Sequence, residues 1–353
     1  MKTINDIDIK NKTVLVRVDY NVPLKNGEIT SDLRIRASLP TLNLLREKGA
    51  EKIILISHLG RPDGADKSLS LKPVADTLNK LIGRVSFVDD VSGEKVSSTA
   101  EKMKKGDILL LENLRFYPGE KANDKDFIKS IIDSTHPDLY VQDGFAVIHR
   151  AHSSTDAVKN FLPVYAGLLV ASEVENLSKA TFHPDHPVLM IIGGAKVEDK
   201  QPLIDKFIKK ADHIFVGGKI AADGYKSTDK KIIVAKDYDE DATGAKLDIG
   251  PLSTAELANL ITDASTIIWN GTLGYTEDPA YATASSITAE LIGEKSGATT
   301  IICGGDTTGF VETMMKDHEN LHYSLVSTGG GASLEFLLGK KLPGLEAIKN
   351  YHD

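Results

Sequence analysis

Short apolar runs that alternate with amphipathic segments constrain the fold of this chain more than any other sequence feature. In the first 150 residues the runs are TVLVRV (13–18), KIILIS (52–57), DILLLE (107–112) and DLYVQD (138–143). Helical patterns lie between them, for example at 36–48 and 71–82. Strands that alternate with helices of about 10–15 residues form parallel sheets. The first half of the chain is therefore predicted to contain a parallel α/β sheet.

The second half repeats this scheme. Its runs are HPVLMIIGG (186–194), DHIFVGG (212–218), KIIVAKD (231–237), STIIWNG (265–271), TTIICGGD (299–306) and YSLVSTGGG (323–331). They are continuously apolar, as expected for strands that are buried on both faces. The segment 168–183 between the halves has a helical pattern. With 353 residues, the chain is predicted to be an α/β protein of two domains joined by this helix.

Composition excludes several classes of protein. No apolar run approaches the roughly 20 residues of a membrane helix, and the N-terminal MKTINDIDIKNK lacks the apolar stretch of a signal peptide. Cys303 is the only cysteine, which excludes an intrachain disulfide and cysteine-based zinc or iron–sulfur sites and favours a cytoplasmic location. The net charge of -8 argues against nucleic acid or an anionic membrane as the main partner.

Arginine and glycine are unevenly distributed. Of the 29 glycines, 9 lie in the first 150 residues and 20 follow. All arginines lie in the first 150 residues: Arg17, Arg34, Arg36, Arg46, Arg61, Arg84, Arg115 and Arg150. Arginine binds phosphate and carboxylate through paired hydrogen bonds, whereas glycine lets the backbone approach a phosphate closely. Unless this asymmetry is compositional drift, the two halves bind anions in different ways.

Five predicted strands of the second half end in glycine turns. The turns read GGAK, VGGK, WNGTLG, CGGD and STGGGAS. Parallel strands bring such turns to one edge of the sheet, and each turn is expected to open a helix whose N-terminus binds phosphate. A plain turn explains any one of them, but five at one edge favour a nucleotide site. Neither G-x-x-x-x-G-K-[ST] nor a well-placed G-x-G-x-x-G occurs, which disfavours a P-loop enzyme or an ordinary dehydrogenase.

Polar residues accompany these turns. Lys196 and Lys200 are four residues apart and are expected on one helix face, where they either bind phosphate or form a solvated surface. Asp306 is expected at a helix N-cap, where it either caps the helix or holds Mg²⁺ among phosphate oxygens. Glu277 follows the WNGTLG turn and could reach a ribose hydroxyl.

The predicted strand ends of the first half carry a different set. The residues are Asp19 and Asn21 after the first run, His58 and Arg61 after the second, Arg115 after the third and Arg150 after the fourth, with Arg34 at the start of a helix. A surface ion pair explains one arginine alone. Four at equivalent positions favour a site for a small, highly anionic substrate that carries a hydroxyl group.

The motif HRAH at 149–152 has three interpretations. A metal site needs further carboxylate or histidine ligands, and a nucleophile–base pair needs a serine or cysteine elbow, which does not stand out here. An anion site with Arg150 as its cation fits best. Either histidine is equally compatible with a structural role, which we prefer for His152.

Over nearly its whole length the sequence resembles the phosphoglycerate kinase family. The motifs that carry the resemblance are VLVRVDYNVPL, RIRASLPT, ISHLGRPDG, LLLENLRFYPGE, DGFAVIHRAHSST, IIGGAKVEDK, LDIGP, IIWNGTLG, GGDTTGFVE and VSTGGGASLEFLLGKKLPG. The resemblance implies two Rossmann-like domains with parallel sheets that face a cleft. The N-terminal domain (1–167) would bind phosphoglycerate and the C-terminal domain (184–336) the nucleotide. The helix 168–183 would be the hinge, and the tail 337–353 would pack back on the N-terminal domain.

The resemblance also implies site residues. The phosphoglycerate site would consist of Asp19, Asn21, Arg34, His58, Arg61, Arg115 and Arg150. The nucleotide site would consist of Gly193, Gly194, Lys196, Lys200, Gly217, Asn270, Glu277, Gly304, Gly305, Asp306, Thr307, Gly329 and Gly330. Arg34 and Lys200 are expected to contact the transferred phosphoryl group, while Lys196 and a Mg²⁺ ion on Asp306 neutralise the nucleotide phosphates. The implied co-substrate is ADP or ATP, and the implied oligomeric state is a monomer.

The implied reaction is reversible phosphoryl transfer from 1,3-bisphosphoglycerate to ADP, in line and after domain closure, as in glycolysis. The nucleophile of the reverse reaction is a carboxylate, which is ionised at neutral pH and needs no general base. Three alternatives stay open: a non-catalytic relative that binds or scaffolds, a kinase with another acyl phosphate product, and a dehydrogenase. The first should lack Lys200, Asp306 or the arginines, and the second should have a changed anion site. A dehydrogenase should have the G-x-G-x-x-G dinucleotide motif, and no well-placed copy of that motif occurs.

The sequence departs from the family pattern in four places. The chain is short, and the missing residues fall between about 226 and 245, where the family has a helix and loop beside the nucleobase. Purine promiscuity is therefore an expectation. Thr272 stands where proline is usual, Cys303 replaces the first glycine of GGGDT, and DGFAVIHRAH replaces DAFGTAHRAH.

Overall fold

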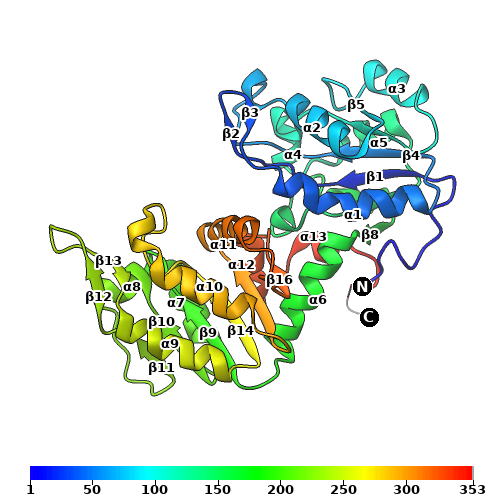
Figure 1. The fold of residues 1–353 in the computed structure, drawn as a ribbon. Coiled ribbons are helices and arrows are strands. Elements are labelled where there is room, and N and C mark those ends of the chain that lie inside the picture. Colours follow the sequence, from blue (N-terminus) through cyan, green and yellow to red (C-terminus); the bar gives the residue numbers. More distant parts are fainter. Residues whose placement is uncertain (352–353) are drawn as a thin grey trace. The chain divides into compact units, whose positions relative to one another are not determined.

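The computed structural model describes residues 1–351 and divides the chain into two compact units (Figure 1). Unit 1 is Met1–Ser172 with the described part of Lys341–Asp353, and unit 2 is Glu173–Lys340. The boundary falls within α6 (Leu168–Phe182), so this helix belongs partly to each unit. Each unit contains a six-stranded parallel sheet, which confirms the predicted α/β class with two parallel sheets.

The sheet of unit 1 has the order β5-β6-β4-β1-β7-β8, and all neighbouring strands are parallel. Its strands are β1 (Thr13–Arg17), β4 (Lys52–Ile56), β5 (Val85–Phe87), β6 (Asp107–Leu110), β7 (Leu139–Gln142) and β8 (Val164–Ala166). Four of them lie within the predicted runs, whereas β5 and β8 were not predicted. Each has three residues, so neither produces a recognisable apolar run.

The helices of unit 1 connect these strands. They are α1 (Leu33–Glu47), α2 (Lys72–Ile82), α3 (Glu94–Glu101), α4 (Pro118–Lys121), α5 (Lys125–Thr135) and α13 (Pro343–Glu346). Short 3-10 helices span Lys67–Leu69, Leu114–Phe116, Phe145–Val147 and Ala157–Asn160, and a small hairpin is formed by β2 (Leu24–Lys25) and β3 (Glu28–Ile29).

The core of unit 1 surrounds the middle of its sheet. Val14, Leu15 and Val16 of β1 are completely buried although they point to alternate faces. Both faces of the sheet are therefore covered, as the continuous apolar runs predicted. The C-terminal segment adds backbone hydrogen bonds, from Gly344 N to Ile148 O at 2.8 Å and from Lys349 N to Val164 O at 2.9 Å.

The sheet of unit 2 has the order β11-β10-β9-β14-β15-β16 and is also parallel. Its strands are β9 (Val188–Ile192), β10 (His213–Val216), β11 (Ile232–Val234), β14 (Thr266–Asn270), β15 (Thr299–Cys303) and β16 (Leu325–Val326). A strand lies within every run that was predicted for this half. Trp269, the only tryptophan, is fully buried in β14.

The helices of unit 2 are α7 (Val197–Phe207), α8 (Gly218–Ala222), α9 (Pro251–Asp263), α10 (Thr283–Gly293), α11 (Gly305–Asp317) and α12 (Gly331–Leu337). A 3-10 helix spans Pro279–Tyr281, and β12 (Tyr238–Glu240) pairs with β13 (Lys246–Ile249) in an antiparallel hairpin. Four of the five glycine turns open a helix. The expectation is wrong for the turn after β14, which leads into an irregular segment before α10. Among residues 1–351, no helix is both long and apolar enough to cross a membrane.

Candidate functional site

The ends of β1 and β4 in unit 1 carry a connected polar group. Asp19 follows β1, is buried, and forms an ion pair with Arg34, the second residue of α1. The other carboxylate oxygen of Asp19 accepts from Asn21 N at 3.1 Å, and Asn21 Oδ1 accepts from Gly60 N at 2.8 Å. The loop after β1 is thus bonded to the loop after β4, and Arg34 is held beside both.

Three further arginines belong to this region. Arg115 lies in the 3-10 helix after β6 and donates through Nη1 to Gly60 O at 2.6 Å. Its pKa is lowered to about 10, first by burial and then by the charges of Arg17 and Arg150. The charge of Arg61 acts on Arg115 in the same sense. Arg61 and Arg150 are exposed, and Arg150 Nε lies 3.2 Å from His149 Nε2.

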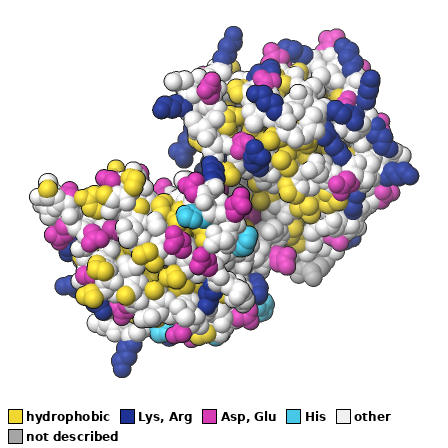
Figure 2. Space-filling model, viewed as in Figure 1, with side chains coloured by type: hydrophobic (Ala, Val, Ile, Leu, Met, Phe, Trp, Pro, Cys, Tyr) yellow, Lys and Arg dark blue, Asp and Glu magenta, His cyan; other side chains and the backbone are white. Residues whose placement is uncertain are grey.

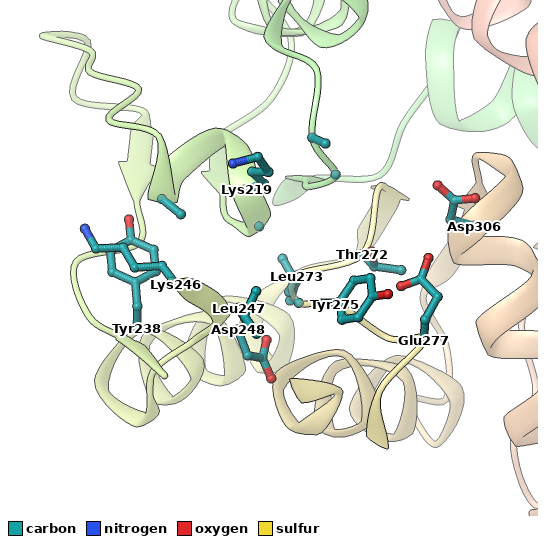
Figure 3. A pocket seen from close by; sticks show the side chains of 15 residues that line it. Lys219, Tyr238, Lys246, Leu247, Asp248, Thr272, Leu273, Tyr275, Glu277 and Asp306 are labelled. Atoms are coloured by element: carbon teal, nitrogen blue, oxygen red, sulfur yellow. The ribbon is translucent and has the colours of Figure 1, made fainter. Parts of the chain in front are cut away.

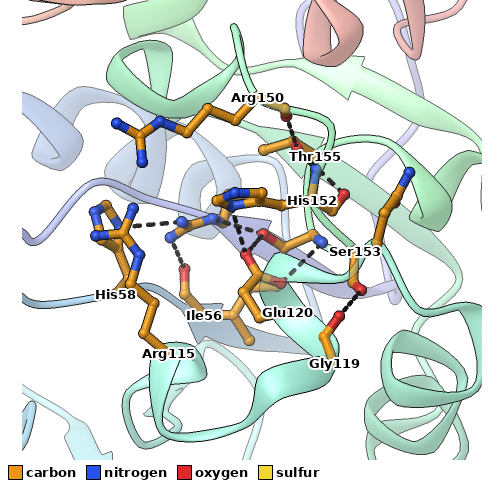
Figure 4. Close-up of polar contacts among 12 residues, drawn as sticks. Ile56, His58, Arg115, Gly119, Glu120, Arg150, His152, Ser153 and Thr155 are labelled. Atoms are coloured by element: carbon orange, nitrogen blue, oxygen red, sulfur yellow. Dashed lines mark hydrogen bonds and ion pairs between the residues drawn. The ribbon is translucent and has the colours of Figure 1, made fainter. Parts of the chain in front are cut away.

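A buried network that was not predicted lies beneath these cations (Figure 4). Arg17, the last residue of β1, is 1% exposed and donates through Nε to Ser154 Oγ at 3.0 Å. Ser154 donates through Oγ to Glu120 Oε1 at 2.6 Å and through its backbone N to Glu120 Oε2 at 3.1 Å. Glu120 is fully buried, and its oxygen lies 3.8 Å from His152 Nδ1. The network places one carboxylate among several cations.

His58 and His152 are both neutral at pH 7. Burial and then the charge of Arg17 lower the pKa of His58 well below its ordinary value. The same causes, with Arg115 and Arg150, lower the pKa of His152 to about 4. With Arg34 also acting on His58, unit 1 contains an excess of positive charge at the carboxyl ends of its strands. Such a site favours a multiply charged anion.

In unit 2 a second polar group lies beyond β9, β14 and β15. Lys200 donates to Asn270 Oδ1, and Asn270 Nδ2 donates to the buried Cys303 Sγ at 3.2 Å. Burial lowers the pKa of Lys200 and raises that of Cys303 to about 11. Lys196 is exposed and precedes α7 in an extended conformation. The expectation that Lys196 and Lys200 share a helix face is therefore wrong, because the helix begins at Val197.

The glycine turns of unit 2 pack backbone against backbone. A Cβ atom on Gly193 would lie 2.2 Å from Thr272 O, and one on Gly218 would lie 2.7 Å from the same oxygen. Gly194 has a φ of +85°, and a Cβ there would lie 3.8 Å from Lys200 Cε. Only glycine allows these loops to converge beside Lys200.

The first turn of α11 contains further predicted residues. Gly304 is the N-cap, with a φ of +93°, and Gly305 is the first helical residue. Asp306 is therefore the second residue of the helix and is exposed, so the capping alternative is wrong. Thr307 is buried and accepts from Gly271 N at 2.8 Å, which joins α11 to the turn after β14.

The loop after β16 is tied to the same helix. Thr308 Oγ1 of α11 donates to Ser327 O at 3.2 Å, and Gly329 N donates to Ser327 Oγ at 3.1 Å. Gly330 follows with a φ of +52°. Ser327 Oγ and Thr328 N both donate to Glu173 in α6, at 2.7 and 2.8 Å.

A cavity of about 190 Å³ extends from this region (Figure 3). Asp306 and Glu277 lie at one end, and Tyr238 and Lys246 of the β12–β13 hairpin lie at the other. Its remaining lining residues are Gly194, Ala195, Gly218, Lys219, Ala222, Leu247, Asp248, Thr272, Leu273, Gly274 and Tyr275. Carboxylates thus lie at the end near α11, whereas Tyr238 and Lys246 of the hairpin line the far end.

The chemistry of this end bears on a metal. Residues 1–351 contain no group of three or more His, Cys, Asp or Glu side chains placed to hold a metal ion. Asp306 and Glu277 are single exposed carboxylates on the same cavity. Such a set fits Mg²⁺ only when phosphate oxygens and water complete the coordination, which is the usual mode of Mg²⁺ binding with nucleotides.

The sequence was compared with known families and proteins. The sequence model of the family "Phosphoglycerate kinase" matches residues 4–241 and 222–340. A phosphoglycerate kinase of Dictyoglomus turgidum is 41% identical over 398 residues, covering 99% of this chain and 99% of the relative. One of Moorella thermoacetica is 40% identical over 393 residues, covering 98% of each. Both alignments are longer than the 353 residues of this chain, so the relatives have segments that it lacks.

Solved structures give the same result. The phosphoglycerate kinase of Coxiella burnetii superposes with a TM-score of 0.80 at 31% identity, covering 98% of each chain. That of Pyrococcus horikoshii superposes with a TM-score of 0.87 at 26% identity, covering 100% of this chain and 99% of the other. The similarity therefore extends over both units.

Proposed function

The chain belongs to the phosphoglycerate kinase family, and from this premise we propose how its two units divide the reaction. The reaction is the reversible transfer of a phosphoryl group from 1,3-bisphosphoglycerate to ADP, which yields 3-phosphoglycerate and ATP. The observation that carries this function is the 41% identity over 99% of the chain. The roles given to individual residues below are our own assignment for this reaction.

Unit 1 is proposed to bind phosphoglycerate. Arg61, Arg115 and Arg150 would bind the phosphate, because guanidinium groups pair with phosphate through parallel hydrogen bonds. Asp19, Asn21 and His58 would orient the hydroxyl and carboxyl groups. The bonds of Asn21 and Arg115 to Gly60 support this assignment, since they hold both side chains at one loop.

Unit 2 is proposed to bind the nucleotide. The backbone N–H groups of the turns at Gly193–Gly194, Gly217, Gly304–Gly305 and Gly329–Gly330 would surround the phosphates. Asn270 O accepts from Gly193 N and Thr307 Oγ1 from Gly271 N, which supports the turns. Glu277 would bind the ribose. Asp306 would hold Mg²⁺ together with phosphate oxygens, and the ion would supply neutralisation of phosphate charge.

Phosphoryl transfer is proposed to depend on position and charge. The carboxylate of 3-phosphoglycerate is ionised at neutral pH, so no side chain has to remove a proton. Arg34 and Lys200 would stabilise negative charge on the transferred group, with Lys196 on the nucleotide phosphates. Because the substrates are held by different units, transfer requires a conformation in which they meet in line. We further propose that the protein acts as a monomer in the cytoplasm.

The first test is ATP-dependent phosphorylation of 3-phosphoglycerate by the purified protein, coupled to a dehydrogenase. We expect turnover, with kcat lowered about 100-fold or more in Lys200→Ala. The control Lys209→Ala changes an exposed lysine just beyond α7 and should leave kcat within about two-fold. GTP run in parallel reports base selectivity. A folded protein that binds both ligands without turnover would overturn the proposal in favour of a non-catalytic relative.

A further inference from the structure

Arg17 is buried and makes four polar contacts, yet it is not part of the proposed substrate site. Its Nη1 donates to Val18 O at 2.9 Å and lies 3.5 Å from Ile56 O. Its Nε donates to Ser154 Oγ at 3.0 Å. Its Nη2 lies 3.1 Å from His58 Nδ1 (Figure 4). The guanidinium plane is therefore fixed at the ends of β1 and β4.

The contact between Arg17 and His58 allows only one assignment of hydrogens. A guanidinium group has five N–H donors and no acceptor, and it stays protonated in proteins. His58 Nδ1 must therefore accept, so it carries no proton. A neutral imidazole with an unprotonated Nδ1 carries its proton on Nε2. Protonation of Nδ1 would direct its N–H at the N–H of Arg17, so the contact also opposes the imidazolium.

The partners on the Nε side of Arg17 explain why a guanidinium group can be buried at this position. Ser154 accepts from Arg17 and donates to Glu120. Glu120 is fully buried and accepts hydrogen bonds from both the hydroxyl and the backbone N–H of Ser154. The carboxylate balances the buried guanidinium through this one serine. Within residues 1–351 no protein group is hydrogen-bonded to His58 Nε2. The donor on Nε2 is therefore available to a ligand beside Arg115 and Arg34.

We propose that Arg17 is a positioning residue that sets the tautomer of His58, so that the ring presents an Nε2–H donor to an oxygen of bound phosphoglycerate. The identity of the ligand rests on the proposed function. The tautomer of His58 does not, because it follows from the contact with Arg17. Arg17 itself does not touch the substrate. A ring with the opposite tautomer would direct an unprotonated Nε2 at a negatively charged oxygen, which is repulsive.

The test reads the tautomer directly, by ¹H–¹⁵N correlation of the histidine rings in the ligand-free protein at pH 7, with His58→Gln to assign the signal. Arg17→Met removes all five donors, and Arg17→Lys keeps a charge and a donor. Arg46→Met is the matched control, because Arg46 is also a structural arginine of unit 1 and donates to Gly106 O, Ile82 O and Gly83 O. It has no bond to His58.

We expect the wild-type protein and Arg46→Met to carry the His58 proton on Nε2, and Arg17→Met to carry a substantial fraction on Nδ1. Arg17→Lys should restore the Nε2–H form. The KM for 3-phosphoglycerate should rise about ten-fold or more in Arg17→Met, while the KM for ATP stays within about two-fold. A purely structural role would lower stability in both methionine variants without changing the tautomer of either.

Two results would overturn the inference. One is a wild-type His58 with its proton on Nδ1, and the other is an unchanged tautomer in a folded Arg17→Met protein. If Arg17→Met does not fold, the wild type and Arg17→Lys still decide, since the inference requires Nε2–H in both. An Nε2–H tautomer in a protein without kinase activity would count against the proposed function and leave the role of Arg17 intact.

Discussion

Arg34 and Arg36 are two residues apart in α1 but have different partners. Arg34 pairs with the buried Asp19, whereas Arg36 forms an (i,i+4) ion pair with Asp32 at the surface. If Arg34 stabilises the transferred phosphoryl group, Arg34→Ala should lower kcat by about 100-fold or more. Arg36→Ala should leave kcat within about two-fold. Initial rates with both substrates varied test this, and a loss confined to the KM for ATP would contradict the assignment.

His152 makes unit 1 sensitive to acid. Its pKa in the folded protein is about 4, below the ordinary value of 6.5, because the ring is buried and Arg17 and Arg115 are near. The unfolded chain therefore binds the proton first, and stability that is present above about pH 6.5 is lost as the pH falls towards 4. At 1.36 kcal/mol per pH unit this contribution is of the order of 3 kcal/mol.

Urea unfolding at pH 7 and pH 4.5, followed by circular dichroism, measures this contribution. The wild-type protein should lose about 2–3 kcal/mol more than His152→Gln between the two pH values. Trp269, the only tryptophan, lies in unit 2, so its fluorescence provides an internal control that the substitution should not affect. Equal losses in the two proteins would exclude His152 as the group responsible.

At the residue scale, strand ends were a useful guide to the candidate site, but its buried support was not predicted. Asp19, Asn21 and His58 lie within four positions of the ends of β1 and β4, which is a local pattern. Glu120 interacts with Arg17 through Ser154, and Glu120 lies 103 positions after Arg17 in the chain. No local pattern links such partners. The one signal was Arg17 itself, a charged residue inside an apolar run, because a buried charge needs a partner.

The boundary between the two units falls within the helix α6. A buried carboxylate forms hydrogen bonds at this helix in each unit. In unit 1, Asp143 accepts from Leu169 N at 3.0 Å and from Val170 N at 3.4 Å in the first turn. In unit 2, Glu173 of the helix accepts from Ser327 and Thr328. Ser327 and Thr328 precede the glycines of the proposed phosphate loop. Asp143 therefore binds the first turn of α6 in unit 1, and Glu173 of its second turn binds the loop after β16 in unit 2.

Asp143 should make stability depend on pH in the opposite direction to His152. Burial raises its pKa to about 7, and within residues 1–351 its Oδ2 has no hydrogen-bond partner. Because the folded pKa lies above the ordinary value of 3.8, stability that is present below about pH 3.8 is lost as the pH rises through 7. Asp143→Asn keeps an acceptor for the helix and removes this ionisation.

We expect Asp143→Asn to become more stable relative to the wild type by about 2–3 kcal/mol between pH 5 and pH 8. Denaturant unfolding at both pH values measures the change. Asp133→Asn is the control, since Asp133 is exposed and pairs with Lys129 in α5, and it should show no such trend. A difference between Asp143→Asn and wild type that does not change with pH would contradict the buried ionisation.

At the element scale, the long apolar runs predicted ten strands, because a strand buried on both faces has a continuous apolar sequence. Boundaries were less certain. Lys196 and Asp306 lie one or two positions from where they were expected, since the first helical residue depends on backbone angles that composition does not determine. The hairpin β12–β13 was also missed. The family match is split within 222–241, next to this hairpin, so family resemblance gave little guidance there.

At the scale of the whole molecule, the division of residue types coincides with the division into units. All arginines lie within Met1–Ser172, and Lys and Arg side chains are numerous on the face of unit 1 in Figure 2. Unit 2 has no arginine and carries the glycine turns. We propose that side-chain cations recognise a small anion in one unit and that backbone N–H groups recognise a polyphosphate in the other. This asymmetry was visible in the sequence, whereas the contacts that implement it were not.

The division predicts where each ligand protects the protein from hydrogen exchange. A ligand at 100 times its Kd stabilises the native state by about 2.7 kcal/mol, and the nearest backbone groups benefit most. We expect 3-phosphoglycerate alone to slow exchange around Asn21, Gly60 and Arg115. MgADP alone should slow exchange at the starts of α7 and α11. Exchange mass spectrometry of the free protein and each binary complex measures this.

Variants that affect one proposed site provide the controls. Arg115→Ala should abolish protection by 3-phosphoglycerate and preserve protection by MgADP, whereas Lys200→Ala should weaken only the protection by MgADP. Each variant thus serves as the folded reference for the other, because the ligand that still binds shows that its unit is intact. Protection by MgADP confined to Met1–Ser172, or by 3-phosphoglycerate confined to Glu173–Lys340, would reverse the assignment of ligands to units. The arginine asymmetry would then need an explanation other than substrate binding.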